Sequence, residues 1–180
     1  MKIVFLDIDG VLNSNPPQNI KKKWADIYKS ADYLMKLDGL DQDIVDNFKY
    51  VIDQTDCKIV FSTSWRYYKD HFIVGSDWRK SLSEMLNVSM DIFIDNIPDI
   101  SFCGGWGSGN YKRRRGDEIK VWLDNNSSKY QIESYCVIDD ETEDIISVVD
   151  KKYVIKTDPR YGLTKIDATK VINVLNQERL

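Results

Sequence analysis

The chain has 180 residues, of which 42% are apolar and five are tryptophan. This is enough for a hydrophobic core, and most economically for a single domain over residues 1–180. The net charge of −4 gives no overall reason to expect nucleic acid or an anionic membrane as a partner. Three widely spaced cysteines form no CxxC pair, residues 1–6 are too short for a signal peptide, and no apolar run approaches membrane-spanning length. We therefore expect a soluble cytoplasmic protein without a membrane partner.

The first predicted element is a buried strand at the N-terminus that ends in acidic residues. Residues 2–6 form an almost continuous apolar run, typical of a strand that is covered on both faces. This run leads directly into Asp7 and Asp9, with Gly10 behind them. Buried carboxylates are costly unless they are paired or bound to a cation, and open α/β sheets bind ligands at the carboxyl ends of their strands. Asp7 and Asp9 are therefore the first candidates for an active site.

The next elements alternate between irregular, helical and extended patterns. Two prolines interrupt regular structure, and we interpret residues 13–40 as a flap or small insertion over the strand end. Apolar residues at helical spacing predict a helix that is capped near Asp41. A second buried strand follows at 58–61 and runs into a polar turn of Ser62, Thr63, Ser64, Trp65 and Arg66. Asp77 is predicted to cap another helix, and residues 91–94 are predicted to form a short strand.

The second half of the chain repeats the alternation. A glycine-rich loop at 103–109 leads into a basic run that ends at Arg115, and a helix is predicted from Asp117 to about Asn125. A third buried strand at 134–138 ends in Asp139 and Asp140. A short helix, a strand at 153–155 and a last helix with a capping-box-like start at Thr164 complete the chain. This order predicts an α/β fold: a Rossmann-like three-layer sandwich with a mainly parallel sheet and only a small flap or cap insertion.

Reactive or phosphate-binding residue types follow three of the predicted strands. Because the carboxyl ends of parallel strands face one edge of the sheet, these residues can converge. Carboxylates from two strands would form an oxygen-rich site suited to Mg²⁺. One aspartate can then attack a phosphorus atom, and a second carboxyl group two residues on can act as acid and later as base. A hydroxyl such as Thr63 and a cation, Arg115 or Lys120, would hold the phosphoryl oxygens.

These motifs resemble the four short motifs of the haloacid dehalogenase (HAD) superfamily of phosphohydrolases. The segment from Asp7 to Val11 matches the first motif, which implies Asp7 as nucleophile and Asp9 as acid/base. The second motif matches at 61–64, with Thr63 as the implied hydroxyl and Ser62 as the alternative, and the third offers Arg115, with Lys120 as the alternative. The fourth matches at Asp139-Asp140. The implied Mg²⁺ ligands are Asp7, Asp9, Asp139 and Asp140.

One branch of the superfamily is similar over four segments. Residues 6–13, 62–66, 115–119 and 162–164 together resemble the HAD domain of Swiss-Army-Knife RNA-repair proteins, and the chain is also similar to the 3′-phosphatase domain of phage polynucleotide kinases. The chain departs from the common pattern in having Arg115, not lysine, before Gly116. The resemblance implies a phosphomonoester hydrolase, and an open site suits the phosphorylated end of a polynucleotide. The substrate-binding candidates are Ser62, Ser64, Arg66, Arg113, Arg114 and Lys120.

Each signal also has a purely structural interpretation. The hydroxyls at 62–64 could form a strand-end turn or a helix cap, and one of Asp139 and Asp140 could only cap the next element. Arg66 could pair with a carboxylate, and the basic run at 112–115 could be a solvated face. Two other functions stay open: a small-molecule phosphatase such as a nucleotidase, and a non-catalytic module that binds Mg²⁺ or nucleic acid.

Overall fold

The computed structural model describes residues 1–14, 40–67, 78–100 and 114–177. Within these ranges the chain forms a five-stranded sheet in the order β3-β2-β1-β4-β5, and every neighbouring pair is parallel. The strands are β1 (Lys2–Leu6), β2 (Lys58–Phe61), β3 (Phe93–Asn96), β4 (Ser134–Asp139) and β5 (Val154–Lys156). The predicted parallel α/β sheet is confirmed. The predicted flap at 13–40, apart from its first two residues and its last, lies outside the described residues, as do Asp77 and the glycine-rich loop at 103–109.

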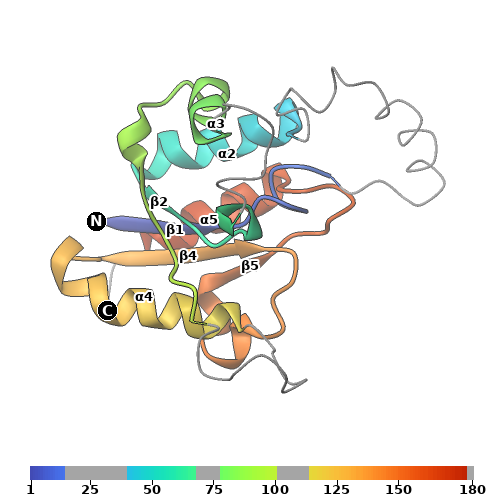
Figure 1. The fold of residues 1–180 in the computed structure, drawn as a ribbon. Helices are drawn as coiled ribbons and strands as arrows, with labels where there is room; N and C mark the ends of the chain where they lie inside the picture. The colour runs from blue at the N-terminus through green and yellow to red at the C-terminus, as the bar shows by residue number, and fades with distance from the viewer. Residues whose placement is uncertain (15–39, 68–77, 101–113, 178–180) are drawn as a thin grey trace.

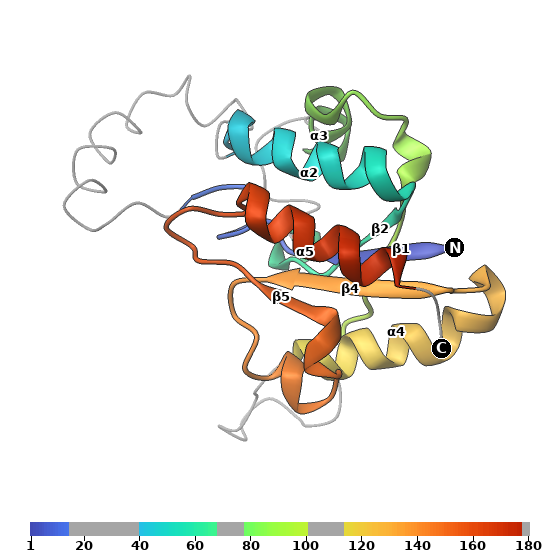
Figure 2. The same ribbon diagram turned by 180° about the vertical axis from the view of Figure 1, so that it is seen from behind.

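Helices cover both faces of this sheet. α2 (Gln42–Thr55), α3 (Trp78–Leu86) and α5 (Lys165–Asn176) lie on one face, and α4 (Arg115–Tyr130) lies on the other (Figures 1 and 2). The buried apolar residues form two clusters accordingly. One joins β1 and β4 to Phe48 of α2 and Val171 of α5, and the other packs Ile119 and Trp122 of α4 against Phe5. This is the predicted three-layer sandwich.

Strand β1 lies at the centre of the sheet, which explains its continuous apolar run. Val4 pairs with Ile59 of β2 on one side and with Cys136 of β4 on the other. From Ile3 to Leu6 successive side chains enter opposite cores, so none of these four positions faces water. Asp7 follows directly, and its backbone N–H still donates to the carbonyl of Ile138 at 3.1 Å. The first carboxylate is therefore held at the carboxyl edge of the sheet by the ladder itself.

The helix boundaries follow local signals in most cases. Asp41 caps α2, accepting from the backbone N–H of Asp43, and α5 opens with the predicted capping box between Thr164 and Asp167. The strand predicted at 91–94 begins two residues later, because residues 90–92 form a 3-10 turn. Helix α4 begins at Arg115 and extends beyond the predicted 117–125 at both ends. No helix in the described ranges combines the length and the apolar character needed to cross a membrane.

Candidate active site

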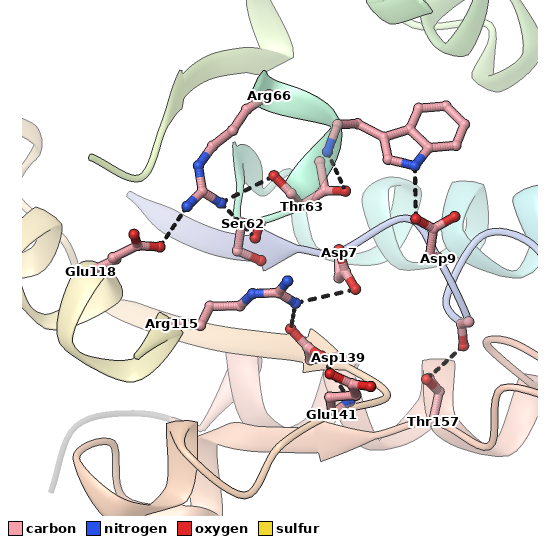
Figure 3. A network of polar contacts seen from close by, with 12 residues as sticks. Asp7, Asp9, Ser62, Thr63, Arg66, Arg115, Glu118, Asp139, Glu141 and Thr157 are labelled. Atoms are coloured by element: carbon pink, nitrogen blue, oxygen red, sulfur yellow. Dashed lines mark hydrogen bonds and ion pairs between the residues drawn. The ribbon is translucent and has the colours of Figure 1, made fainter. Parts of the chain in front are cut away.

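Asp7 lies just beyond β1 and is almost fully buried, with 4% of its surface exposed. Its Oδ2 atom is 3.2 Å from Nη1 of Arg115 (Figure 3). Burial raises the pKa of Asp7, whereas the Arg115 charge and a hydrogen bond from the Thr63 side chain lower it; burial is the larger effect. The structure therefore presents a carboxylate that is costly to ionise alone, beside one cation and one hydroxyl.

Three carboxylates meet at this edge of the sheet. Asp7, Asp139 and Asp140 each offer one oxygen atom, and these atoms all lie within 4.8 Å of one another. Nη1 of Arg115 also contacts Oδ2 of Asp139 at 2.5 Å, and the backbone N–H of Glu141 donates to Oδ1 of Asp139 at 2.9 Å. A single guanidinium cannot neutralise three carboxylates. The excess negative charge and the all-oxygen donor set fit Mg²⁺, which is bound through few carboxylates and keeps its waters.

The pKa of Asp139 gives this cluster a testable pH dependence. Burial, the largest effect, raises the pKa of Asp139 from 3.8 to about 7. Because the folded state holds this proton more tightly than the unfolded chain, Asp139 stabilises the metal-free fold below about pH 4, and this contribution is lost as the pH rises through about 7. Mg²⁺ requires ionised ligands, so we expect it to raise the melting temperature more at about pH 8 than at about pH 5.5.

Thermal unfolding with Mg²⁺ or with a chelator at the two pH values measures this difference. An Asp139→Asn variant should reduce the pH dependence, which Asp7 still contributes to, and lose most of the Mg²⁺ response. Equal shifts at the two pH values in the wild type would contradict the prediction.

Asp9 lies outside the acidic cluster. Its carboxylate is exposed and accepts hydrogen bonds from Nε1 of Trp65 at 2.8 Å and Nδ2 of Asn13 at 3.0 Å. The predicted metal set contained Asp9, but the carboxylates that the structure brings together are those of Asp7, Asp139 and Asp140. Its predicted role as acid/base needs access to a leaving group, and the exposed carboxylate has that access.

The hydroxyls of the second motif lie in the turn that follows β2. Thr63 is fully buried, and its Oγ1 accepts from the backbone N–H of Trp65 at 3.2 Å. Ser62 is also fully buried, and its Oγ has no hydrogen-bond partner among the described residues. Ser64 is half-buried and opens a short 3-10 helix, Ser64–Tyr67. Of the two candidates, Thr63 is the one whose hydroxyl bonds to Asp7.

The predicted cations separate into different environments. Arg115, the first residue of α4, reaches the acidic cluster, whereas Lys120 is more than half exposed and pairs with Asp124 at 2.9 Å. Arg114 contacts Asp117 at 3.3 Å and donates to the Ser147 hydroxyl at 2.8 Å. Arg113 lies outside the described residues. The geometry thus brings Arg115, the first choice for the third motif, to Asp7.

Arg66 has an interior position where the sequence led us to expect substrate contact. Its Nη2 atom is 2.5 Å from Oε2 of Glu118, and its Nη1 atom donates to the carbonyls of Ser62 and Thr63 at 2.8 and 3.0 Å (Figure 3). Sequence reasoning did not single out Glu118. The two residues are 52 positions apart, so no local spacing indicates their pairing, although both lie in the segments that carry the family resemblance.

Gly10 is required by close contact as well as by backbone geometry. Its φ is +70°, and an added Cβ would lie 2.6 Å from Oδ2 and 2.7 Å from Cγ of Asp140. A side chain would therefore displace Asp140 and strain the backbone by about 1–2 kcal/mol. We expect Gly10→Ala to fold with reduced stability and to lose most of the Mg²⁺-dependent rise in melting temperature.

Gly162 supplies the matched control for Gly10. Its φ is +63°, but an added Cβ would meet Cδ1 of Ile44 at 2.6 Å, not a carboxylate. Gly162→Ala should therefore lose stability and keep its response to Mg²⁺. An unchanged Mg²⁺ response in Gly10→Ala would contradict the assigned contact.

The fold and the site together define a class of protein. The fold is a three-layer sandwich with a parallel sheet, and an aspartate follows its central strand. A turn that carries hydroxyl side chains, a basic residue at the start of a helix and an acidic strand end surround this aspartate. This is the arrangement of HAD-type phosphohydrolases. The family model for the HAD domain in Swiss Army Knife RNA repair proteins matches residues 3–168, and the chain belongs to this family. Comparison with curated proteins and with solved structures gives no match. The family points to hydrolase or phosphatase activity and generally depends on Mg²⁺.

Proposed function

We propose that this protein is a Mg²⁺-dependent phosphomonoester hydrolase that works through an aspartyl-phosphate on Asp7. The observation that supports it most directly is the buried Asp7 carboxylate, placed at the strand end beside Arg115 and within 4.8 Å of the Asp139 and Asp140 oxygens. A merely structural aspartate would not need two further carboxylates at this distance, because each adds repulsion.

The reaction has two steps on this chain's own residues. A carboxylate oxygen of Asp7 attacks phosphorus, the bond from phosphorus to the leaving oxygen breaks, and protonated Asp9 gives its proton to that oxygen. Asp9 then takes a proton from water, which attacks the aspartyl-phosphate, releases inorganic phosphate and restores Asp7. Arg115 and Thr63 hold the phosphoryl oxygens during both steps. Asp7, Asp139 and Asp140 would hold Mg²⁺, which would supply positive charge to offset the negative charge of the phosphoryl group.

The proposed substrate is a polynucleotide with a 3′-phosphate. Its support is the family's description as a domain of RNA repair proteins. Arg114, half exposed at the N-cap of α4 and adjacent to Arg115 in the sequence, would contribute sequence-independent affinity for phosphates. The alternative, a small-molecule phosphatase such as a nucleotidase, uses the same chemistry.

Phosphate release from matched substrates separates these functions. We expect faster release from a 3′-phosphorylated oligoribonucleotide than from its 5′-phosphorylated isomer or from a nucleoside 3′-monophosphate, with a preference that weakens at high salt. Equal or faster release from the mononucleotide would refute the polynucleotide substrate and favour the nucleotidase. A wild type that releases no phosphate from any of these substrates or from an aryl phosphate with Mg²⁺ would leave only the non-catalytic module.

A further inference from the structure

Both carboxylate oxygens of Asp9 are engaged by side-chain donors. The indole Nε1–H of Trp65 donates to Oδ2 at 2.8 Å, and Nδ2 of Asn13 donates to Oδ1 at 3.0 Å. Asp9 is exposed, and an exposed aspartate ordinarily samples several rotamers. Two donors on opposite oxygens restrict both the position and the rotation of the carboxylate. Figure 3 shows Asp9 on the side of the site that carries the Thr63 turn.

The orientation of the Asn13 amide follows from its second contact. The backbone N–H of Gly10 donates to Oδ1 of Asn13 at 2.7 Å. A backbone N–H can only donate, so the atom facing Gly10 must be the oxygen, and the amide nitrogen then faces Asp9. Asn13 thus connects the turn after β1 to the carboxylate that this turn carries. A residue present only to close the turn would need the oxygen alone.

Trp65 approaches the same carboxylate from a different strand end. It lies in the 3-10 helix Ser64–Tyr67 after β2, and its own backbone N–H donates to Oγ1 of Thr63. One short turn therefore sets the Thr63 hydroxyl against Asp7 and the Trp65 indole against Asp9. The spacing between the nucleophile and the second carboxylate is thereby set by partly buried groups in the turns that follow β1 and β2.

This arrangement leaves Asp9 able to exchange a proton. A carboxylate offers about four lone-pair positions, and the two donors occupy one on each oxygen, so each oxygen keeps a position for a leaving group or a water. Proton transfer demands precise placement, and a misplacement of about 1 Å can cost on the order of 10²-fold in rate. We propose that Trp65 and Asn13 are positioning residues that hold the Asp9 carboxyl group in line with the leaving oxygen. This proposal rests on the proposed phosphatase function.

The test exploits the leaving group. Trp65→Phe keeps an aromatic ring at this position and removes the N–H donor together with the five-membered ring of the indole, a loss of volume that the control variant below shares. An alkyl phosphate such as glycerol 2-phosphate needs a proton on its leaving oxygen, whereas p-nitrophenyl phosphate has a stable leaving anion and needs little assistance. Because Asp9 is also the base in the second step, which both substrates share, the substrates are compared by kcat/KM, which reports the first step alone. We expect Trp65→Phe to lower kcat/KM on the alkyl phosphate by about 10-fold and to change kcat/KM on the aryl phosphate by less than about 2-fold.

Asn13→Asp provides an independent second variant. It retains an oxygen for the Gly10 N–H and removes the donor to Asp9, so it should show the same selective loss on the alkyl phosphate. This variant keeps the test decisive if Trp65→Phe folds poorly.

Trp122→Phe is the matched control. Trp122 lies in the core on the α4 face of the sheet, and its Nε1 also donates to a carboxylate, that of Asp95, at 2.7 Å. It should alter stability and leave the ratio of the two activities unchanged. If kcat/KM falls equally on both substrates in Trp65→Phe and Asn13→Asp, or falls on neither, the positioning role is refuted while the phosphatase function stands. A wild type inactive on both substrates with Mg²⁺ would refute the phosphatase function itself.

Discussion

Asp7→Asn is expected to reduce Mg²⁺-dependent phosphate release by at least about 10⁴-fold, because an amide cannot form the aspartyl-phosphate. The side chain keeps its shape, so the fold should persist. The loss is measured as the steady-state rate of phosphate release from p-nitrophenyl phosphate. The leaving group of this substrate does not need Asp9 as an acid, so the rate reports the loss of the nucleophile.

The stability of the same variant is the control. Burial raises the pKa of Asp7, so the ionised carboxylate is a cost to the metal-free fold, and its replacement should leave the melting temperature equal or higher without Mg²⁺. Residual activity above about 1% in a preparation free of wild type would contradict the assignment of Asp7 as nucleophile. A large fall in melting temperature would indicate that the aspartate is instead a structural residue.

Glu118→Ala is expected to lower the free energy of unfolding by about 3–5 kcal/mol, because it leaves the Arg66 guanidinium charged and buried without its carboxylate. Only 7% of the Arg66 side chain and 2% of the Glu118 side chain are exposed. Burial raises the pKa of Glu118, and the Arg66 charge opposes this increase, so the pair is needed to keep the carboxylate ionised. Equilibrium unfolding in urea measures the change.

The exposed pair between Lys120 and Asp124 is the matched control on the same helix. Both side chains are more than half exposed, and such i,i+4 pairs contribute about 0.3–0.5 kcal/mol. Lys120→Ala should therefore change the free energy of unfolding by less than about 1 kcal/mol. A similarly small change in Glu118→Ala would show that water reaches Arg66 when its partner is removed.

The strand ends were predictable because each combines two signals that are local in sequence. A buried strand is evident from an apolar run, and Asp7, the pair Ser62-Thr63 and Asp139 each come at the carboxyl end of such a run. Parallel pairing then brings the ends to one edge without any knowledge of side-chain contacts. The fold class and the convergence of Asp7 with the fourth motif could therefore be anticipated from residue order alone.

Contacts that depend on rotamers could not be anticipated. Asp9 and Asp7 are two residues apart, yet the carboxylate of Asp9 contacts Trp65 and Asn13 and not the acidic cluster. Arg66 and Arg115 both lie in or beside a motif. Arg66 pairs with Glu118 inside the protein, whereas Arg115 reaches Asp7 and Asp139. Sequence pattern gives the strand that carries a side chain; the direction in which that side chain points is decided by packing between distant elements.

The pairing of β1 with both β2 and β4 has a consequence for the growing polypeptide on the ribosome. The edge of β1 that faces β2 can be paired as soon as residues 58–61 have emerged, but its other edge must wait for residues 134–138. Pairing two strands that are so far apart in the sequence is slow, and a central strand with an unpaired edge can associate with other chains. The same late event delivers Asp139 and Asp140 to Asp7. Nascent chains that end before β4 should therefore need chaperones and should bind no magnesium, and both properties should appear together once β4 is inserted.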